Sequence, residues 1–113
     1  MKTTEQGRLA ESAVAKELSR QSYKISELNW RTRLCEIDII ARKKDIVYFV
    51  EVKYRSSNSQ GDGFEYITGA KLRQMKFAAQ LWVQQNDWLG DWRLLAAAVS
   101  GDNAEKIEFL EID

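Results

Sequence analysis

Two charged residues interrupt the most apolar stretch of the chain. Residues 46–54 read Ile-Val-Tyr-Phe-Val-Glu-Val-Lys-Tyr, a composition typical of a strand that is buried on both faces. Glu51 and Lys53 stand two positions apart, so on a strand both side chains point to the same face. An ionised carboxylate in an apolar interior is costly unless it is paired, hydrogen-bonded or bound to a metal ion. Glu51 therefore needs a compensating partner.

Two kinds of partner satisfy Glu51. The first is Lys53 itself, in a structural ion pair near the end of the strand. The second involves residues 35–41, whose pattern predicts another strand. A hairpin with its turn at residues 42–45 would bring Asp38 close to Glu51 and Lys53. Two carboxylates repel each other unless a cation or a shared proton intervenes, whereas carboxylate oxygens beside a lysine suit Mg²⁺.

The composition removes several other catalytic chemistries. Among the 113 residues there is no histidine and one cysteine, Cys35. Without histidine there is no Ser-His-Asp or Cys-His nucleophile system and no histidine-ligated zinc site. A single cysteine excludes an intrachain disulfide, and neither a dinucleotide fingerprint nor a Gly-Lys-Ser/Thr phosphate loop occurs. Carboxylates, lysine and a metal ion are the chemistry that remains.

Length and patterning predict one folded domain that spans residues 1–113. With 44% hydrophobic and 30% charged residues, the chain has the composition of an ordinary folded protein. No apolar run approaches the length of a membrane span, and no apolar segment follows the first residues as in a secretion signal. We therefore expect a cytoplasmic protein without a membrane partner.

Charge is balanced overall but unevenly distributed. Seventeen basic and seventeen acidic residues give a net charge of zero, which counts against a general DNA binder. Acidic residues crowd the C-terminal end, whereas basic residues gather at Arg42, Lys43, Lys44, Lys53 and Arg55, and again at Lys71, Arg73 and Lys76. This distribution indicates either a phosphate-binding face around the carboxylates or an ordinary solvated surface.

The periodicity predicts an α/β domain with the order α-β-β-β-α-β-β, in which helices pack on a mixed sheet. Besides the hairpin, the expected elements are a helix over residues 4–22, a strand over 23–30, a helix over 68–85 and strands over 92–99 and 106–112. Polar, glycine-rich residues 56–63 predict a loop, which is either a plain connector or a lid or substrate-contacting loop. Trp88 and Trp92 flank a turn, where they either belong to the core or stack on bases or a partner.

Each predicted helix carries a charged residue in an unusual place. Glu11 lies on the apolar stripe of the first helix, where pairing with Arg8 or Lys16 is the structural explanation. Lys71 lies in the first turn of the second helix, at the positive end of the helix dipole. A cation gains little there unless it faces an anion.

These residues resemble two related protein families. Asp38 followed by Glu51-Val52-Lys53 resembles the D…(D/E)-x-K core of the PD-(D/E)XK nuclease superfamily. The pattern by itself is common, but a longer ordered set resembles the small bacterial YraN family, which is similar to the archaeal Holliday junction resolvases. That set runs from the first helix to the second and comprises Gly7 and Glu11, Asn29-Trp30-Arg31, residues 36–41, residues 49–55 and Lys71.

The resemblance implies a restriction-endonuclease-like fold and an endonuclease that uses Mg²⁺ or Mn²⁺ to hydrolyse DNA phosphodiesters, with branched DNA as the implied substrate. In that assignment Asp38, Glu51 and Glu11 hold the metal ion, while Lys53 orients the nucleophile and stabilises charge. The side chains expected to grip flanking phosphates are Arg42, Lys43, Lys44, Arg55 and Lys71.

Two other interpretations stay open. The chain is either a catalytically inactive nuclease-fold module that binds nucleic acid or a protein, which its neutral charge favours, or a structural domain with a buried ion network. Two positions also depart from the family pattern, because Cys35 stands where glycine is usual and no aspartate follows Arg93. These patterns leave open whether the chain forms a homodimer.

Overall fold

Helices and strands follow one another in the predicted order. The computed structural model describes residues 5–55 and 63–112. Its elements are α1 (Glu5–Arg20), β1 (Lys24–Arg31), β2 (Glu36–Lys43), β3 (Ile46–Tyr54), α2 (Gly69–Gln85), β4 (Asp91–Ser100) and β5 (Lys106–Ile112). The α-β-β-β-α-β-β order is therefore confirmed. The predicted helix start at residue 4 and most of the predicted loop, residues 56–62, lie outside the described residues.

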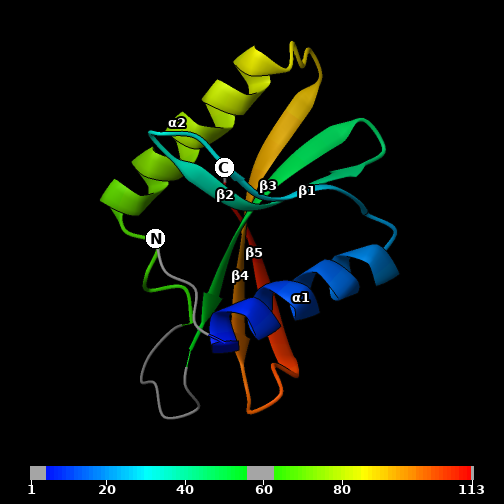
Figure 1. The fold of residues 1–113 in the computed structure, drawn as a ribbon, viewed down its shortest axis with the longest axis vertical. Coiled ribbons are helices and arrows are strands. Elements are labelled where there is room, and N and C mark those ends of the chain that lie inside the picture. Colours follow the sequence, from blue (N-terminus) through cyan, green and yellow to red (C-terminus); the bar gives the residue numbers. More distant parts are fainter. Residues whose placement is uncertain (1–4, 56–62, 113) are drawn as a thin grey trace.

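The strands form one mixed sheet in the order β1-β2-β3-β4-β5. Neighbouring strands are antiparallel except β3 and β4, which run parallel with Glu51 opposite Ala96 and Lys53 opposite Ala98. A parallel pair needs a crossover connection, and α2 lies in the one between β3 and β4. Figure 1 shows α1 and α2 on opposite faces of the sheet. Strand β3 is thus central and covered on both sides, which explains its apolar composition.

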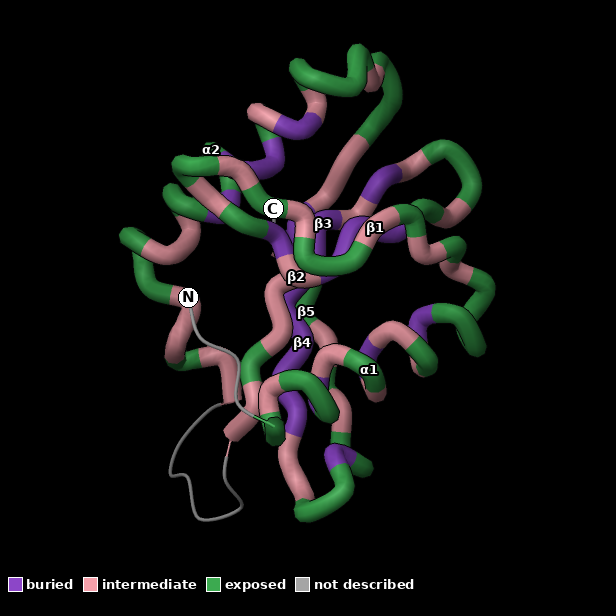
Figure 2. Tube along the Cα trace, in the orientation of Figure 1, coloured by how far each residue is buried: buried purple, intermediate pink, exposed green. Residues whose placement is uncertain are grey.

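Two apolar clusters hold these layers together, one on each face of the sheet. Helix α1 packs into the first cluster with Val14 and Leu18, and α2 packs into the second with Ala79 and Trp82. Strand β3 supplies both clusters by alternation, so that Val50 belongs to the first cluster and its neighbour Phe49 to the second. Figure 2 shows the buried residues gathered along the centre of the sheet. Burial of one such side chain contributes roughly 1.5–3 kcal/mol.

The hairpin between β2 and β3 is tighter than predicted. Both strands continue into the expected turn, where Arg42 pairs with Val47 and Lys43 with Ile46. The turn is formed by Lys44, in the left-handed region at φ 57°, and Asp45. Strands pair through backbone N–H and C=O groups. The pairing therefore includes residues such as Arg42 and Lys43, whose charged side chains reach solvent at the end of the sheet.

The arrangement is a single α/β domain that is consistent with the restriction-endonuclease-like fold. Trp88 and Trp92 pack against the cluster under α2, and the rings of Trp92 and Phe49 meet edge to face at 5.7 Å. Both tryptophans are therefore partly buried against the core, as the core interpretation predicts. Neither of the two described helices is long and apolar enough to span a bilayer.

Candidate active site

Glu51 finds its compensating cation on α2. Lys71 Nζ lies 2.8 Å from Glu51 Oε2, and both side chains are partly buried. Thr68 caps the helix by accepting a hydrogen bond from the backbone N–H of Lys71, which fixes the first turn against the sheet. The ion pair therefore forms with Lys71 and not with Lys53, the nearest cation in sequence. Facing an anion also offsets the unfavourable position of Lys71 in the helix dipole.

Asp38 lies where β2 leaves β3. The pairing of these strands ends at Ile39 opposite Val50, although β2 continues to pair with β1 beyond that point. Asp38 Oδ2 accepts a hydrogen bond of 2.8 Å from the backbone N–H of Val52. The carboxylate thus replaces a strand carbonyl as the acceptor, and this bond anchors Asp38 beside Glu51.

Like charge surrounds the Asp38 carboxyl. Its burial and the nearby carboxylates of Glu51, Glu11 and Glu36 raise the pKa of Asp38 from 3.8 to about 7, against the opposing effect of the Val52 N–H. Within residues 5–55 and 63–112, no cationic side chain forms an ion pair with Asp38. A carboxyl in such surroundings favours a proton or a bound cation.

Glu11 of α1 joins the same group of carboxylates. Partial burial raises the pKa of Glu11, a hydrogen bond with the Asn29 side chain opposes this shift, and the charges of Glu36 and Glu51 raise the pKa further. Asn29 has a φ of 53°, a left-handed conformation that asparagine tolerates better than most residues. Asn29 thus orients Glu11, a role for which the Asn-Trp-Arg run was the only sequence signal.

The chemistry of these side chains fits a hard cation. The four carboxylates offer the oxygen ligands that Mg²⁺ and Mn²⁺ prefer, and Glu36 adds one acid to the three predicted. In the described part of the chain, however, no three acidic or cysteine side chains stand close enough together to hold a metal ion as placed. Like charges keep such side chains apart, and Glu51 is bound to Lys71. A cation that binds here therefore competes with Lys71 for Glu51.

Lys53 and Arg55 end β3 in different ways. Lys53 is exposed and forms no ion pair with any described side chain, so the strand brings it near Glu51 without bonding the two. Arg55 donates its backbone N–H to the Val99 carbonyl at 2.7 Å and Nη1 to the Gly63 carbonyl at 3.2 Å. Arg55 thereby ties the end of β3 to Gly63, which precedes α2 in the chain.

The basic hairpin turn lies at the start of β3 (Figure 1), and Glu51 lies toward the other end of this strand. The first half of β3 separates the two by roughly 17 Å at 3.4 Å per residue. Arg42 lies over the ring of Trp88 and Lys43 over that of Tyr23, 4.7 and 4.8 Å from the ring centroids. The hairpin thus places Arg42, Lys43 and Lys44 outside any basic face around the carboxylates, and their contact with flanking phosphates stays a prediction.

Tyr66 is a residue of this site that sequence reasoning missed. Its hydroxyl is buried and has no hydrogen-bond partner among the described residues. Burial and the negative charges of Glu51 and Asp38 raise the pKa of Tyr66, while Arg55 lowers it. The hydroxyl therefore stays protonated at neutral pH, and it can donate a hydrogen bond to a ligand that binds at the carboxylates. Its only sequence signal is an aromatic residue between the glycine-rich loop and the second helix.

Replacing Tyr66 with phenylalanine is expected to leave the protein as stable as the wild type or to stabilise it by up to about 1 kcal/mol. The reason is that a buried hydroxyl without a partner contributes nothing that offsets its desolvation. Tyr54→Phe is the matched control, because the Tyr54 hydroxyl donates to the Gly101 carbonyl at 3.2 Å and its loss should cost about 1 kcal/mol. Urea unfolding measures both. A loss for Tyr66→Phe equal to that of Tyr54→Phe would contradict the unpartnered hydroxyl.

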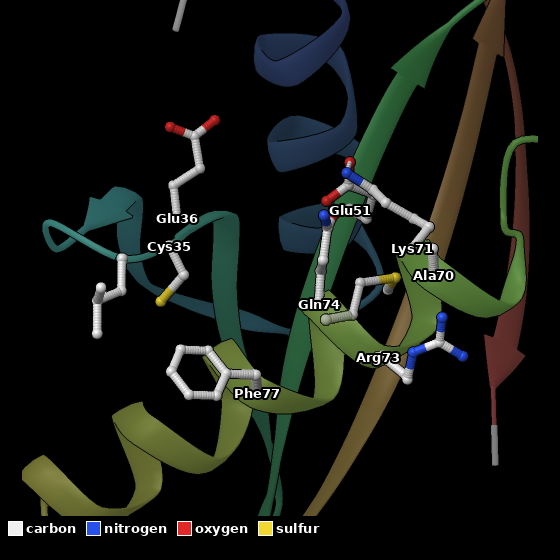
Figure 3. A pocket seen from close by; sticks show the side chains of 10 residues that line it. Cys35, Glu36, Glu51, Ala70, Lys71, Arg73, Gln74 and Phe77 are labelled. Atoms are coloured by element: carbon white, nitrogen blue, oxygen red, sulfur yellow. Dashed lines mark ion pairs between the residues drawn. The ribbon is translucent and has the colours of Figure 1, made fainter.

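A cleft of about 580 Å³ opens beside the carboxylates. One wall is α2 and the other is the loop before β2, and the lining side chains include Leu34, Glu36, Glu51, Lys71, Arg73 and Phe77. Figure 3 shows Lys71 directed toward Glu51, with Phe77 on the side of Cys35. The cleft thus joins two of the carboxylates, Glu36 and Glu51, to basic and apolar side chains on a single concave surface.

Thr32 holds the loop that forms the second wall. Its Oγ1 accepts hydrogen bonds from the backbone N–H groups of Leu34 and Cys35, at 3.0 and 3.2 Å. The backbone of Cys35 is not in the left-handed region, so a cysteine is accommodated here without strain.

Fold and site together define a small α/β domain whose sheet carries converging carboxylates at the edge of a cleft. Sequence comparison places this domain in a family. The profile of the Uncharacterised protein family UPF0102 matches residues 10–107. The chain therefore belongs to the UPF0102 family, to which YraN-like proteins belong.

Relatives in distant bacteria match nearly the whole chain. A UPF0102 protein of Desulforapulum autotrophicum is 36% identical over 107 residues, which cover 92% of this chain and 88% of that protein. One from Cytophaga hutchinsonii is 33% identical over 102 residues, 90% of each chain. One from Sulfurihydrogenibium is 32% identical over 109 residues, 96% of this chain and 95% of the relative. The likeness thus extends over the whole α/β domain.

Proposed function

We propose that this protein is a metal-dependent endonuclease that hydrolyses DNA phosphodiester bonds. The observation that carries the proposal is the environment of Asp38, which is crowded by three other carboxylates and forms no ion pair with a described cation. A structural ion network would place a cation against such a carboxylate. Uncompensated negative charge next to Glu51, which lines the cleft, instead suits a cationic cofactor.

Each proposed ligand is positioned by a different element. Asp38 and Glu51 would hold Mg²⁺ or Mn²⁺, with Glu11 bound directly or through water. When bound, the ion would lower the pKa of a water molecule and offset charge on the phosphate. The Val52 N–H forms a hydrogen bond with Asp38, and the Asn29 side chain forms one with Glu11. These hydrogen bonds hold both carboxylates toward the site.

The cations of the site would act on the substrate. Lys53 extends from the same strand face as Glu51 and is exposed, which suits a role in stabilising charge on the phosphate. Lys71, once exchanged for a metal ion at Glu51, is free to bind a neighbouring phosphate. Arg55 and the hairpin turn with Arg42, Lys43 and Lys44 would contact phosphates farther along the DNA.

A binding module without turnover is the second candidate. It is favoured by the ion pair between Glu51 and Lys71, which occupies one of the proposed metal ligands, and by the net charge of zero. In that case DNA or a protein partner would bind at the same cleft. A second copy of the chain as a homodimer partner is compatible with either function.

Cleavage of DNA separates the two candidates. Supercoiled plasmid and a four-way junction are incubated with the protein in Mg²⁺, in Mn²⁺ and in chelator, and the products are resolved on gels. The proposed nuclease cuts one or both substrates with either metal ion and neither substrate in chelator. Binding of both DNAs without any cut in Mg²⁺ and Mn²⁺ would establish the binding module instead.

A further inference from the structure

The cleft beside Glu51 carries side chains that phosphodiester hydrolysis does not require. Leu34 and Phe77 are large apolar residues that remain 74% and 47% exposed, and both line this cleft. Lys71 and Arg73 place positive charge on the α2 wall. A ligand in this cleft therefore meets apolar surface, cations and the carboxylates of Glu36 and Glu51 together (Figure 3).

One nucleotide with an unpaired base has the same combination of properties. Its phosphate is attracted by Arg73 and competes with Glu51 for Lys71, and its base offers an apolar face that stacks on an aromatic ring. The volume of about 580 Å³ lies within the range of sites that enclose small ligands. In an intact duplex both faces of each base are already stacked on neighbours, so Phe77 would have no base face to contact.

We propose that this cleft binds one unpaired nucleotide of a DNA strand, with the base against Phe77 and Leu34 and the phosphate toward Lys71 and Arg73. The inference deepens the proposed function and rests on it only for the position of the cut. A nucleotide held here lies beside Glu51, so cleavage occurs next to unpaired positions, and fully paired DNA is the poorer substrate.

Binding measured in chelator tests the cleft without relying on cleavage. Fluorescence anisotropy is recorded with a short labelled single strand, with the fully paired duplex of the same sequence and with strands that carry one abasic position. The variants are Phe77→Ala and Leu34→Ala. Leu89→Ala is the matched control, since Leu89 is 97% exposed and does not line the cleft.

Wild type is expected to bind the single strand more tightly than the duplex. Phe77→Ala should weaken single-strand binding about tenfold and leave duplex binding unchanged, because base–aromatic stacking is the interaction removed. One abasic position in the strand should likewise weaken its binding to wild type about tenfold. In Phe77→Ala, the abasic position should cause no further loss of affinity, because the missing base and the missing ring belong to the same contact. Leu89→Ala should bind every DNA as wild type does.

Two results would overturn the inference. One is a Phe77→Ala protein that loses as much affinity at the abasic position as wild type does. The other is unchanged DNA affinity in both cleft variants, which would indicate a protein partner in the cleft. Circular dichroism verifies folding, and Leu34→Ala, in an exposed loop, carries the test if Phe77→Ala unfolds. Base-dependent binding without cleavage would refute the nuclease activity and support the nucleotide site. Cleavage without base-dependent binding would support the nuclease activity and refute the nucleotide site.

Discussion

Replacing Asp38 with asparagine is expected to stabilise the protein in chelator by up to about 4 kcal/mol at a pH of about 8.5, and to change its stability little at a pH of about 4. The substitution removes the charge that is crowded by Glu51, Glu11 and Glu36. It keeps an oxygen that can accept the hydrogen bond from Val52. Asparagine thus resembles the protonated carboxyl, which the surroundings favour.

The direction of the effect follows from the raised pKa of Asp38. In the unfolded chain this carboxyl titrates near 3.8, whereas burial and the neighbouring carboxylates raise its pKa to about 7 in the folded protein. Between these values the folded protein holds a proton that the unfolded chain has lost. The free energy of unfolding of wild type therefore falls as the pH rises through this window, by about 1.4 kcal/mol per pH unit, and the full penalty persists above pH 7.

Urea unfolding of wild type and Asp38→Asn across this pH range measures the difference. Asp45→Asn is the matched control, because the Asp45 side chain is fully exposed and lies 3.9 Å from Arg42. It should change stability little at every pH. If Asp38 belongs to a structural ion network, Asp38→Asn will instead lose roughly 3–5 kcal/mol, because a buried partner is left uncompensated. That result would remove the main support for a metal site.

Glu51→Gln is expected to lower metal-dependent cleavage on the order of a thousandfold or more while leaving DNA binding largely intact. Glu51 acts on three other residues of the site, since its charge raises the pKa of Glu11, Asp38 and Tyr66. Glutamine removes one charged metal ligand and no phosphate contact. Lys71 loses its partner, but its partly exposed ammonium can turn to solvent, so the fold should survive.

Thermal melts with and without Mg²⁺ accompany the cleavage assay. Mg²⁺ at a hundred times its dissociation constant should stabilise wild type by about 2.7 kcal/mol and Glu51→Gln by much less. The stabilisation of wild type should grow as the pH rises through about 7, because Asp38 must lose its proton before it binds a cation. Asp45→Asn should respond to Mg²⁺ and cleave as wild type does. Equal cleavage by Glu51→Gln and wild type would show that Glu51 is not a metal ligand.

Local patterns in the sequence determined the elements and half of the site. The alternation of apolar residues in β3 and the periodicity of both helices predict the observed order, because both patterns depend on neighbours only a few positions apart. Asp38 and Glu51 meet for the same reason, since a short hairpin joins their strands. The hairpin turn is the exception among these local features. It consists of Lys44 and Asp45, whereas the run of charged residues predicted a turn over residues 42–45.

Tertiary packing decided the rest of the site. Lys71 became the partner of Glu51 because the apolar face of α2 packs across the sheet and carries its first turn to the end of β3. Asn29 reaches Glu11, and Tyr66 comes near the carboxylates, through the same kind of packing between segments far apart in sequence. No short-range pattern encodes such contacts, since they depend on how whole elements bury their apolar faces. Sequence therefore determined which residues carry charge on the sheet, whereas the two packed layers determined which cations and hydroxyls face those residues.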